Sequence, residues 1–248
     1  MIKKEYLWYI DAIIDANSKR NKANPKHNHN VKDDFGGKVF FDGKKWKYDD
    51  SGKHQKKDKI IVLVLESPHK DEFNKKGIPI RPLNNREVIE KNIDKVLKLH
   101  LKTSDTYCIY FINAICLQCS LGFDTELFRD VVFLYYWEKY KKNFEKRFDK
   151  MVRNYRNDVE LVINAVTKGT HKKLPYLFNS EKKQFDYIYT KCGKSFFADI
   201  CNTNEKYDSL QSVVKESILS VLGKNGKKQI YKEGTHPSGW YSKKAIIH

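Results

Sequence analysis

The chain has 248 residues, which is long enough for one large domain with a sizeable core. Its 48 Lys and Arg outnumber 31 Asp and Glu, giving a formal net charge of +17, and 15 Tyr and 14 Phe accompany them. This composition suits a surface that neutralises phosphates and stacks on bases, although charge alone would also suit an anionic membrane surface or a ribosomal partner. No apolar stretch approaches the ~18 residues that span a bilayer, and no signal-peptide core opens the chain, so we expect a cytoplasmic protein without a membrane partner. We also expect it to be a monomer.

The first 57 residues are expected to form an amphipathic helix, at residues 3–17, followed by an irregular extension. One hairpin is predicted inside the extension, pairing residues 39–41 with residues 46–48 across a turn of Asp and Gly. Histidines in this stretch, including His54, are expected to be solvated, because no Cys or carboxylate cluster at ligand spacing accompanies them.

From residue 58 onward, strand and helix patterns alternate, and residues 58–248 are expected to form one α/β domain. The sequence predicts a three-layer α/β/α sandwich around a short, mostly parallel sheet. Residues 180–226 are expected to be an insertion with a strand at 185–190 and a helix at 208–222. The core strands are predicted at 60–65, 107–115, 159–166 and 229–232, and the other helices at 85–101 and 124–153.

The five cysteines are an odd number without the spacing of a disulfide framework, so they are expected to be reduced. Cys116 and Cys119 have the spacing of half a metal site. No second close Cys pair completes such a site, and burial beside an apolar strand is the favoured interpretation.

Polar segments follow the first and last predicted core strands at the point where each strand ends. Glu66-Ser67-Pro68-His69 comes directly after the first strand, and residues 235–240 follow the last one. Asn113 lies near the end of the second strand. Because the carboxyl ends of parallel strands line the ligand crevice of an open α/β sheet, these residues are predicted to converge on one site.

Together these segments resemble the uracil-DNA glycosylase superfamily, whose two signature loops follow the first and last core strands. The family's first loop is a short Pro-containing segment such as Gly-Gln-Asp-Pro-Tyr, and residues 65–69 occupy that place. The second loop begins His-Pro-Ser, as residues 236–238 do, and Asn113 matches a base-reading Asn at the end of the second core strand. Residues 77–84, including Ile78, are similar to the family loop that helps stack the base. The resemblance covers about residues 58–178 and 226–242.

The resemblance implies a DNA glycosylase that flips a pyrimidine out of DNA and hydrolyses its N-glycosidic bond. His236 would donate a hydrogen bond to the base oxygen that gains negative charge, and Asn113 would read the edge of the flipped base. Each has a purely structural interpretation as well: His236 packed in a turn beside Pro237, and Asn113 capping the backbone of its own strand.

The first loop departs from the family at the water-activating position. Ser67 stands where the best-known members hold an Asp, so Glu66 is expected to orient water instead, with Asp71 or Glu72 close enough in sequence to substitute. His69 stands where the family has a Tyr that excludes 5-substituted pyrimidines. With Pro68 beside this smaller ring, we expect a pocket that accepts a bulkier base, such as the hypermodified cytosines of some phage genomes.

DNA contacts are expected from two further segments. Ser238, Trp240, Lys243 and Lys244 lie in the carboxy-terminal loop, where Trp240 would either wedge into a duplex or bury against the sheet. His171 and Lys172 follow the third strand and are expected to contact backbone phosphate. The resemblance implies no metal and no cofactor.

Two alternatives remain open on the sequence. The first is a non-catalytic DNA-binding module of the same fold, since Ser67 replaces the catalytic Asp. The second is a metal-dependent nuclease or phosphoesterase, with hard or borderline ligands drawn from Glu66, His69, Asp71, Glu72 and His236.

Overall fold

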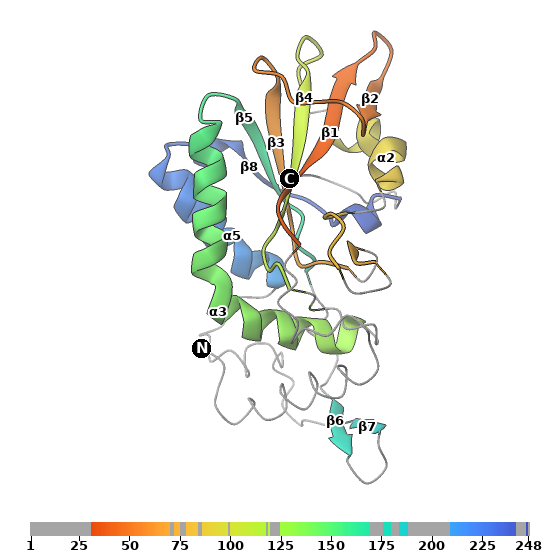
Figure 1. Ribbon diagram of the computed structural model, residues 1–248, viewed down its shortest axis with the longest axis vertical. Coiled ribbons are helices and arrows are strands. Elements are labelled where there is room, and N and C mark those ends of the chain that lie inside the picture. The colour runs from red at the N-terminus through yellow and green to blue at the C-terminus, as the bar shows by residue number, and fades with distance from the viewer. Residues whose placement is uncertain are drawn as a thin grey trace.

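The computed structural model describes residues 31–69, 72–74, 78–83, 86–98, 100–117, 119, 125–168, 176–179, 184–187, 209–241 and 247. The helix predicted at residues 3–17 lies outside these residues. Within them, the fold is a mixed α/β arrangement around a six-stranded sheet of order β2-β1-β4-β3-β5-β8 (Figure 1).

The sheet is mostly parallel, as the sequence predicts. β3, β4, β5 and β8 run parallel to one another, whereas β1 is antiparallel to both β2 and β4. The strands are β1 (Asp34–Phe41), β2 (Trp46–Asp49), β3 (Lys59–Leu65), β4 (Tyr107–Asn113), β5 (Val159–Asn164) and β8 (Tyr231–Glu233).

The helices fall close to their predicted positions. They are α2 (Glu87–Leu97), α3 (Thr125–Asn154) and α5 (Leu210–Lys224), with the short 3-10 turns η3 (Lys228–Ile230) and η4 (Pro237–Gly239). β7 (Gln184–Tyr187) lies in the predicted insertion and pairs with β6 (Tyr176–Asn179), which precedes the insertion, in a separate two-stranded sheet. The last core strand is displaced from its predicted place, because residues 228–230 coil into η3 and pairing with β5 begins only at Tyr231.

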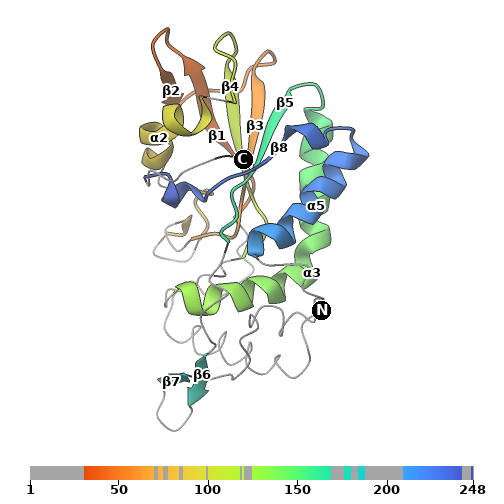
Figure 2. The same cartoon turned by 180° about the vertical axis from the view of Figure 1, so that it is seen from behind.

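β3 is central and contributes to apolar clusters on both faces of the sheet, which explains its unbroken apolar sequence. Its residues Ile60, Val62 and Val64 belong to one cluster with α3 and α5. The alternate residues Ile61, Leu63 and Leu65 belong to the other, with α2. Seen from behind, α5 and α3 lie together, away from α2 (Figure 2).

The prediction of an irregular extension before residue 58 is wrong for residues 34–49, which form two strands. The predicted hairpin does form, as β1 and β2, but β1 also pairs with β4 and so extends the central sheet. This pairing requires an irregularity between Phe35 and Gly37, where Gly37 adopts a φ of 113° that favours glycine. Residues 34–49 therefore belong to the same sheet as the core strands, and the expected boundary at residue 57 falls between its strands.

His54 is not a solvated loop histidine, contrary to the prediction. Its Nδ1 lies 3.2 Å from the hydroxyl of Tyr110, which in turn lies 3.2 Å from the hydroxyl of Tyr155. The imidazole packs edge-on against both tyrosine rings. Tyr110 of β4 and Tyr155, which follows α3, thus bury part of the His54 side chain, although the sequence neighbours of His54 are polar.

A buried ion pair ties the hairpin to the start of β3. Lys38 Nζ lies 2.8 Å from Asp58 Oδ2, and the Asp58 side chain is fully buried. Burial raises the pKa of Asp58, but hydrogen bonds from Lys38, from the Gln55 N–H and from the Cys108 thiol outweigh it, so the net shift is downward. The pair therefore stabilises the fold above the ordinary carboxyl pKa, and this contribution is lost as the pH falls through the lowered pKa.

We predict that Lys38→Met lowers the free energy of unfolding by about 3–5 kcal/mol near neutral pH, because it leaves a buried carboxylate without its counter-ion. The matched control is Lys47→Met, whose 3.6 Å contact with Asp42 is more exposed, and which should cost at most about 1 kcal/mol. Urea unfolding at neutral and at acid pH measures both. Equal losses in the two variants, or a Lys38→Met loss that grows in acid, would contradict the assignment.

Candidate functional site

The candidate site lies at the carboxyl edge of the parallel strands, where backbone pairing continues beyond the strand ends. The Ala114 and Ile115 N–H groups donate to the carbonyls of Leu65 and Glu66, at 2.8 and 3.0 Å. On the other side of β3, the Ala165 N–H donates to Val64 at 2.9 Å. The exits of β4, β3 and β5 are thus held side by side.

Glu66 follows β3 directly and is only 4% exposed. The Thr167 hydroxyl, from the exit of β5, donates to its Oε2. The Ser67 hydroxyl lies 3.5 Å from its Oε1. Hydroxyl groups from two directions therefore fix the orientation of this carboxylate at the strand exit.

Asn113 ends β4 and pairs in register with Leu65 of β3. Its side chain is 1% exposed, and neither Oδ1 nor Nδ2 has a hydrogen-bond partner within the described parts of the chain. A buried amide left in this state costs roughly 1–3 kcal/mol. The predicted alternative, in which the Asn113 side chain caps its own strand, is therefore not what the structure shows.

Asn164 provides an internal comparison, since it is fully buried and ends the next parallel strand but one, β5. Its Nδ2 donates to the Gln211 carbonyl at 2.9 Å and to the Tyr231 hydroxyl at 3.1 Å. Its Oδ1 accepts from the Val166 N–H at 3.3 Å. Asn164 thus has a complete structural role, whereas none of the described residues uses the hydrogen-bonding capacity of the Asn113 amide.

The backbone at Asn113 is held by Arg147 of α3. Its guanidinium donates to the Asn113 carbonyl at 2.7 Å and forms an ion pair with Asp33. Burial raises the pKa of Asp33, with the charge and hydrogen bond of Arg147 acting in the opposite direction. Because the carbonyl is engaged from the α3 side, the end of β4 is fixed without using the Asn113 amide.

The exit of β8 carries His236 within a tight turn. The Gln211 side chain bridges the carbonyls of Asn164 and Gly234, at 2.7 Å each, so the ends of β5 and β8 are joined. His236 is partly buried, and its carbonyl accepts from the Gly239 N–H at 2.8 Å. The neighbouring Thr235 hydroxyl oxygen is buried and, within the described residues, without a hydrogen-bond partner.

Trp240 buries against the sheet, which decides between its two predicted roles. It is 1% exposed, belongs to the apolar cluster of α2, and its indole N–H donates to the Thr235 carbonyl at 2.9 Å. Its own carbonyl accepts from Lys95 of α2 at 3.3 Å. The indole therefore anchors the turn that carries His236, and it is not presented to enter a duplex.

The remaining predicted residues divide into those that the structure places and those that it does not describe. Pro68 is buried, while His69 and Ile78 are exposed in the segment between β3 and α2. Ser238 lies in η4, with its side chain not described. The predicted residues outside the described parts of the chain are Asp71, His171, Lys172, Lys243 and Lys244.

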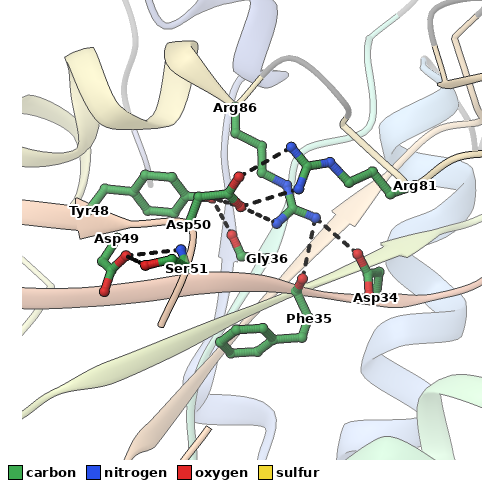
Figure 3. A network of polar contacts seen from close by, with 9 residues as sticks. All are labelled: Asp34, Phe35, Gly36, Tyr48, Asp49, Asp50, Ser51, Arg81 and Arg86. Carbon is green, nitrogen blue, oxygen red and sulfur yellow. Dashed lines mark hydrogen bonds and ion pairs between the residues drawn. The ribbon is translucent and has the colours of Figure 1, made fainter. Parts of the chain in front are cut away.

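A polar network fixes the start of α2 and the loop before it (Figure 3). Arg86, only 6% exposed, forms ion pairs with Asp50 at 2.5 Å and Asp34 at 3.0 Å. Arg81 reaches the other oxygen of Asp50 at 3.2 Å. Burial opposes ionisation of Asp50, but the two guanidinium groups together hold its pKa below the ordinary value. The loop that precedes α2 is thereby tied to the β1–β2 hairpin.

Sequence reasoning missed the two threonines at this edge. Thr167 and Thr235 follow the last residues of β5 and β8 by only a few positions. A hydroxyl residue just beyond each predicted parallel strand was the available signal. Threonine is common in loops, so this signal alone does not single out either residue. The structure shows that the Thr167 hydroxyl binds Glu66, whereas the Thr235 hydroxyl is buried without a partner among the described residues.

Comparison with protein-family models, with curated proteins and with solved structures found no match to this chain. Across the described residues, no group of three or more His, Cys, Asp and Glu side chains is arranged to hold a metal ion. In the same part of the chain, no helix is both long and apolar enough to cross a membrane. Any proposal for the function therefore rests on the arrangement of the residues that follow the strand ends.

We predict that Asn113→Leu leaves the free energy of unfolding unchanged or raises it, because replacing an unpaired buried amide by an apolar side chain of similar size removes a desolvation cost. Asn164→Leu, the matched control, should lower it by about 2–3 kcal/mol, since it removes three hydrogen bonds and leaves their partners buried. Urea unfolding of both variants measures the difference. A large loss of stability in Asn113→Leu would show that the Asn113 amide has a structural role.

Proposed function

We propose that this chain is a DNA glycosylase similar to the uracil-DNA glycosylase superfamily, with its helices and sheet forming a three-layer α/β/α sandwich. The observation that supports it most strongly is the Asn113 amide, buried at a strand exit and without a partner in the described structure. An amide offers both a donor and an acceptor, which is what recognition of a pyrimidine edge requires. Natural proteins rarely retain an unsatisfied buried polar group unless a ligand supplies its missing hydrogen bonds.

In the proposed reaction, three groups from separate strands act on one flipped nucleotide. Asn113 reads the base, and His236 donates a hydrogen bond to the base oxygen that becomes negative as the glycosidic bond breaks. Glu66, oriented by Ser67 and Thr167, positions the attacking water. The continued pairing of the strand exits supports this convergence, since it keeps all three at the same edge of the sheet.

The proposed partner is DNA, and the net charge of +17 supports it. Neutralising phosphates with Lys and Arg supplies most of the sequence-independent affinity of such proteins. The proposed target is a pyrimidine. His69, which stands where the superfamily has a Tyr that excludes 5-substituted pyrimidines, is exposed beyond β3 and would leave room for a substituent on the base. We therefore propose a hypermodified cytosine, of the kind found in some phage genomes, as the preferred base.

A non-catalytic DNA-binding module is the second candidate, and one observation favours it. Both carboxylate oxygens of Glu66 already lie beside hydroxyl donors, Ser67 on one and Thr167 on the other. A carboxylate engaged in this way has less capacity to take a proton from water. Such a protein would bind a flipped base without releasing it.

The test is to incubate the protein with duplexes containing uracil, hydroxymethylcytosine, glucosylated hydroxymethylcytosine or unmodified cytosine, and to identify any released base by mass spectrometry. We predict release of a modified cytosine, abasic sites that break in alkali, and no effect of a metal chelator. Binding without release would favour the non-catalytic module, and release of uracil alone would remove the proposed preference for bulky bases.

Two variants assign the release to this site. His236→Ala should slow single-turnover release by about 100-fold or more while changing DNA affinity far less, because the hydrogen bond that it removes strengthens only as charge develops on the base. His100→Ala is the control, since His100 lies between α2 and the start of β4, away from the carboxyl edge. Equal rates in wild type and His236→Ala would exclude the proposed role of His236.

A further inference from the structure

We propose that Ile78 and Ile80 form an apolar wedge that enters the base stack of double-stranded DNA and occupies the space vacated by the flipped base. This inference rests on the proposed function and assigns to this chain the residues that hold the duplex open. The sequence resemblance places both isoleucines in a loop that helps stack the base and names Ile78 as the base-binding residue. The structure points instead to the two side chains acting together on the duplex.

Both isoleucines are unusually exposed. Ile78 is 48% and Ile80 is 51% exposed, and they stand two residues apart in an extended segment, so their side chains point to the same side. Among the described residues, the other exposed large hydrophobic side chains are single ones at Phe40, Tyr140 and Tyr241. Isolated exposed hydrophobics are common on soluble proteins, whereas two adjacent ones on the same side of a segment offer a single apolar contact surface to a partner.

The protrusion is held in shape by backbone pairing. Asn74 and Ile78 are joined twice, by the Asn74 N–H to the Ile78 carbonyl at 2.9 Å and by the Ile78 N–H to Asn74 Oδ1 at 3.0 Å. The Ile80 N–H donates to the Glu72 carbonyl at 2.8 Å, and Phe73 and Pro79 form an antiparallel bridge. Ile78 and Ile80 are therefore presented on a short hairpin-like turn.

The base of this turn is anchored to the rest of the fold. Arg81, directly after Ile80, is paired with Asp50, and Asp50 is paired in turn with the buried Arg86 at the start of α2 (Figure 3). Such an anchor keeps the two apolar side chains exposed in a fixed position. A preorganised wedge loses little conformational entropy when it binds.

The protrusion also lies at the appropriate edge of the molecule. The segment between β3 and α2 lies beyond the carboxyl ends of the parallel strands, the edge that carries Asn113 (Figures 1 and 2). The aromatic residue predicted as a possible wedge, Trp240, is buried and engaged by its own hydrogen bonds. Among the described residues, Ile78 and Ile80 are thus an exposed apolar pair in the segment that follows the carboxyl end of β3.

A DNA duplex suits this protrusion better than an apolar protein surface does. Isoleucine is among the side chains that proteins insert between base steps, and unstacking a step costs a few kcal/mol that the inserted side chain offsets. The net charge of +17 draws the protein to the phosphates on either side of such a step. A purely apolar protein partner would leave that charge without a complement.

The experiment compares Ile78→Ala/Ile80→Ala with wild type on two probes of the same sequence: a duplex carrying a tetrahydrofuran abasic-site analogue, and the corresponding single strand. A 2-aminopurine placed next to the analogue reports unstacking by its fluorescence. We expect the double variant to lose about 10-fold or more in duplex affinity and most of the fluorescence rise, because offsetting one unstacked step is worth at least 1.4 kcal/mol. Its affinity for the single strand should be almost unchanged.

Two controls accompany the double variant. Ile78→Leu/Ile80→Leu keeps the apolar volume and should retain duplex affinity. Tyr140→Ala removes an exposed aromatic side chain from α3 and should change neither probe. Thermal unfolding of each variant confirms that these surface substitutions leave the fold intact.

The outcomes separate this inference from the proposed function. Equal losses on duplex and single strand, or no loss on either, would overturn the wedge, while wild-type binding and base release would still support a glycosylase. Wild-type protein that binds neither probe would overturn both. A duplex-specific loss in a protein that releases no base would support the wedge in the non-catalytic module.

Discussion

The parallel pairing of β3 with β4 on one side and β5 on the other determines the geometry of the candidate site. It sets Leu65 opposite Asn113 and Val64 opposite Asn164, and the backbone hydrogen bonds of Ala114, Ile115 and Ala165 extend this alignment past the strand ends. A slip of one residue would turn every side chain of a strand to the other face of the sheet. Because β3 is apolar on both faces, its apolar run alone would tolerate such a slip. The slip is costly because it would draw a charged residue at one end of the run, Lys59 or Glu66, into the buried part of the sheet.

The two strand-end asparagines show how the same residue type acquires different roles. Around Asn164, the α5 carbonyl of Gln211 and the hydroxyl of Tyr231 supply partners from both neighbouring elements. Around Asn113, the corresponding polar group from a helix is Arg147, and it bonds the backbone carbonyl instead of the side chain. The end of β4 is therefore rigid while its amide has no partner among the described residues, which is the combination that a preorganised recognition site requires. A fold selected for stability alone would place an apolar residue there.

The parts of this structure that follow from local pattern were predictable, and the parts that depend on distant contacts were not. Apolar runs located β3, β4 and β5, because a strand buried on both faces has a continuous apolar sequence. Helical spacing located α2 and α3, because a helix buried on one face has apolar residues every three or four positions. The pairing of β1 with β4 depends on residues about 70 positions apart in sequence and leaves no local signal beyond the hairpin itself. The burial of Trp240 and of His54 likewise depends on α2, Tyr110 and Tyr155, so their polar or basic sequence neighbours were misleading. The strand ends predicted that Glu66, Asn113 and His236 lie at the carboxyl edge of the sheet, whereas the contact of Thr167 with Glu66 could be found only once β5 was known to neighbour β3.

The departure at Ser67 from the superfamily's pattern has a physical consequence in the proposed reaction. The transition state resembles an oxocarbenium ion, which is so electrophilic that the attacking water needs orientation more than it needs a strong base. The Glu66 carboxylate, with the hydroxyl groups of Ser67 and Thr167 beside its two oxygens, is an oriented hydrogen-bond acceptor for such a water. Most of the catalytic effect would then come from stabilising the negative charge that develops on the base. His236 would supply this stabilisation, and the indole of Trp240 would hold the turn that positions His236. The Ser at position 67 is therefore compatible with glycosidic hydrolysis, provided that the departing base, rather than the water, is the group that this site activates.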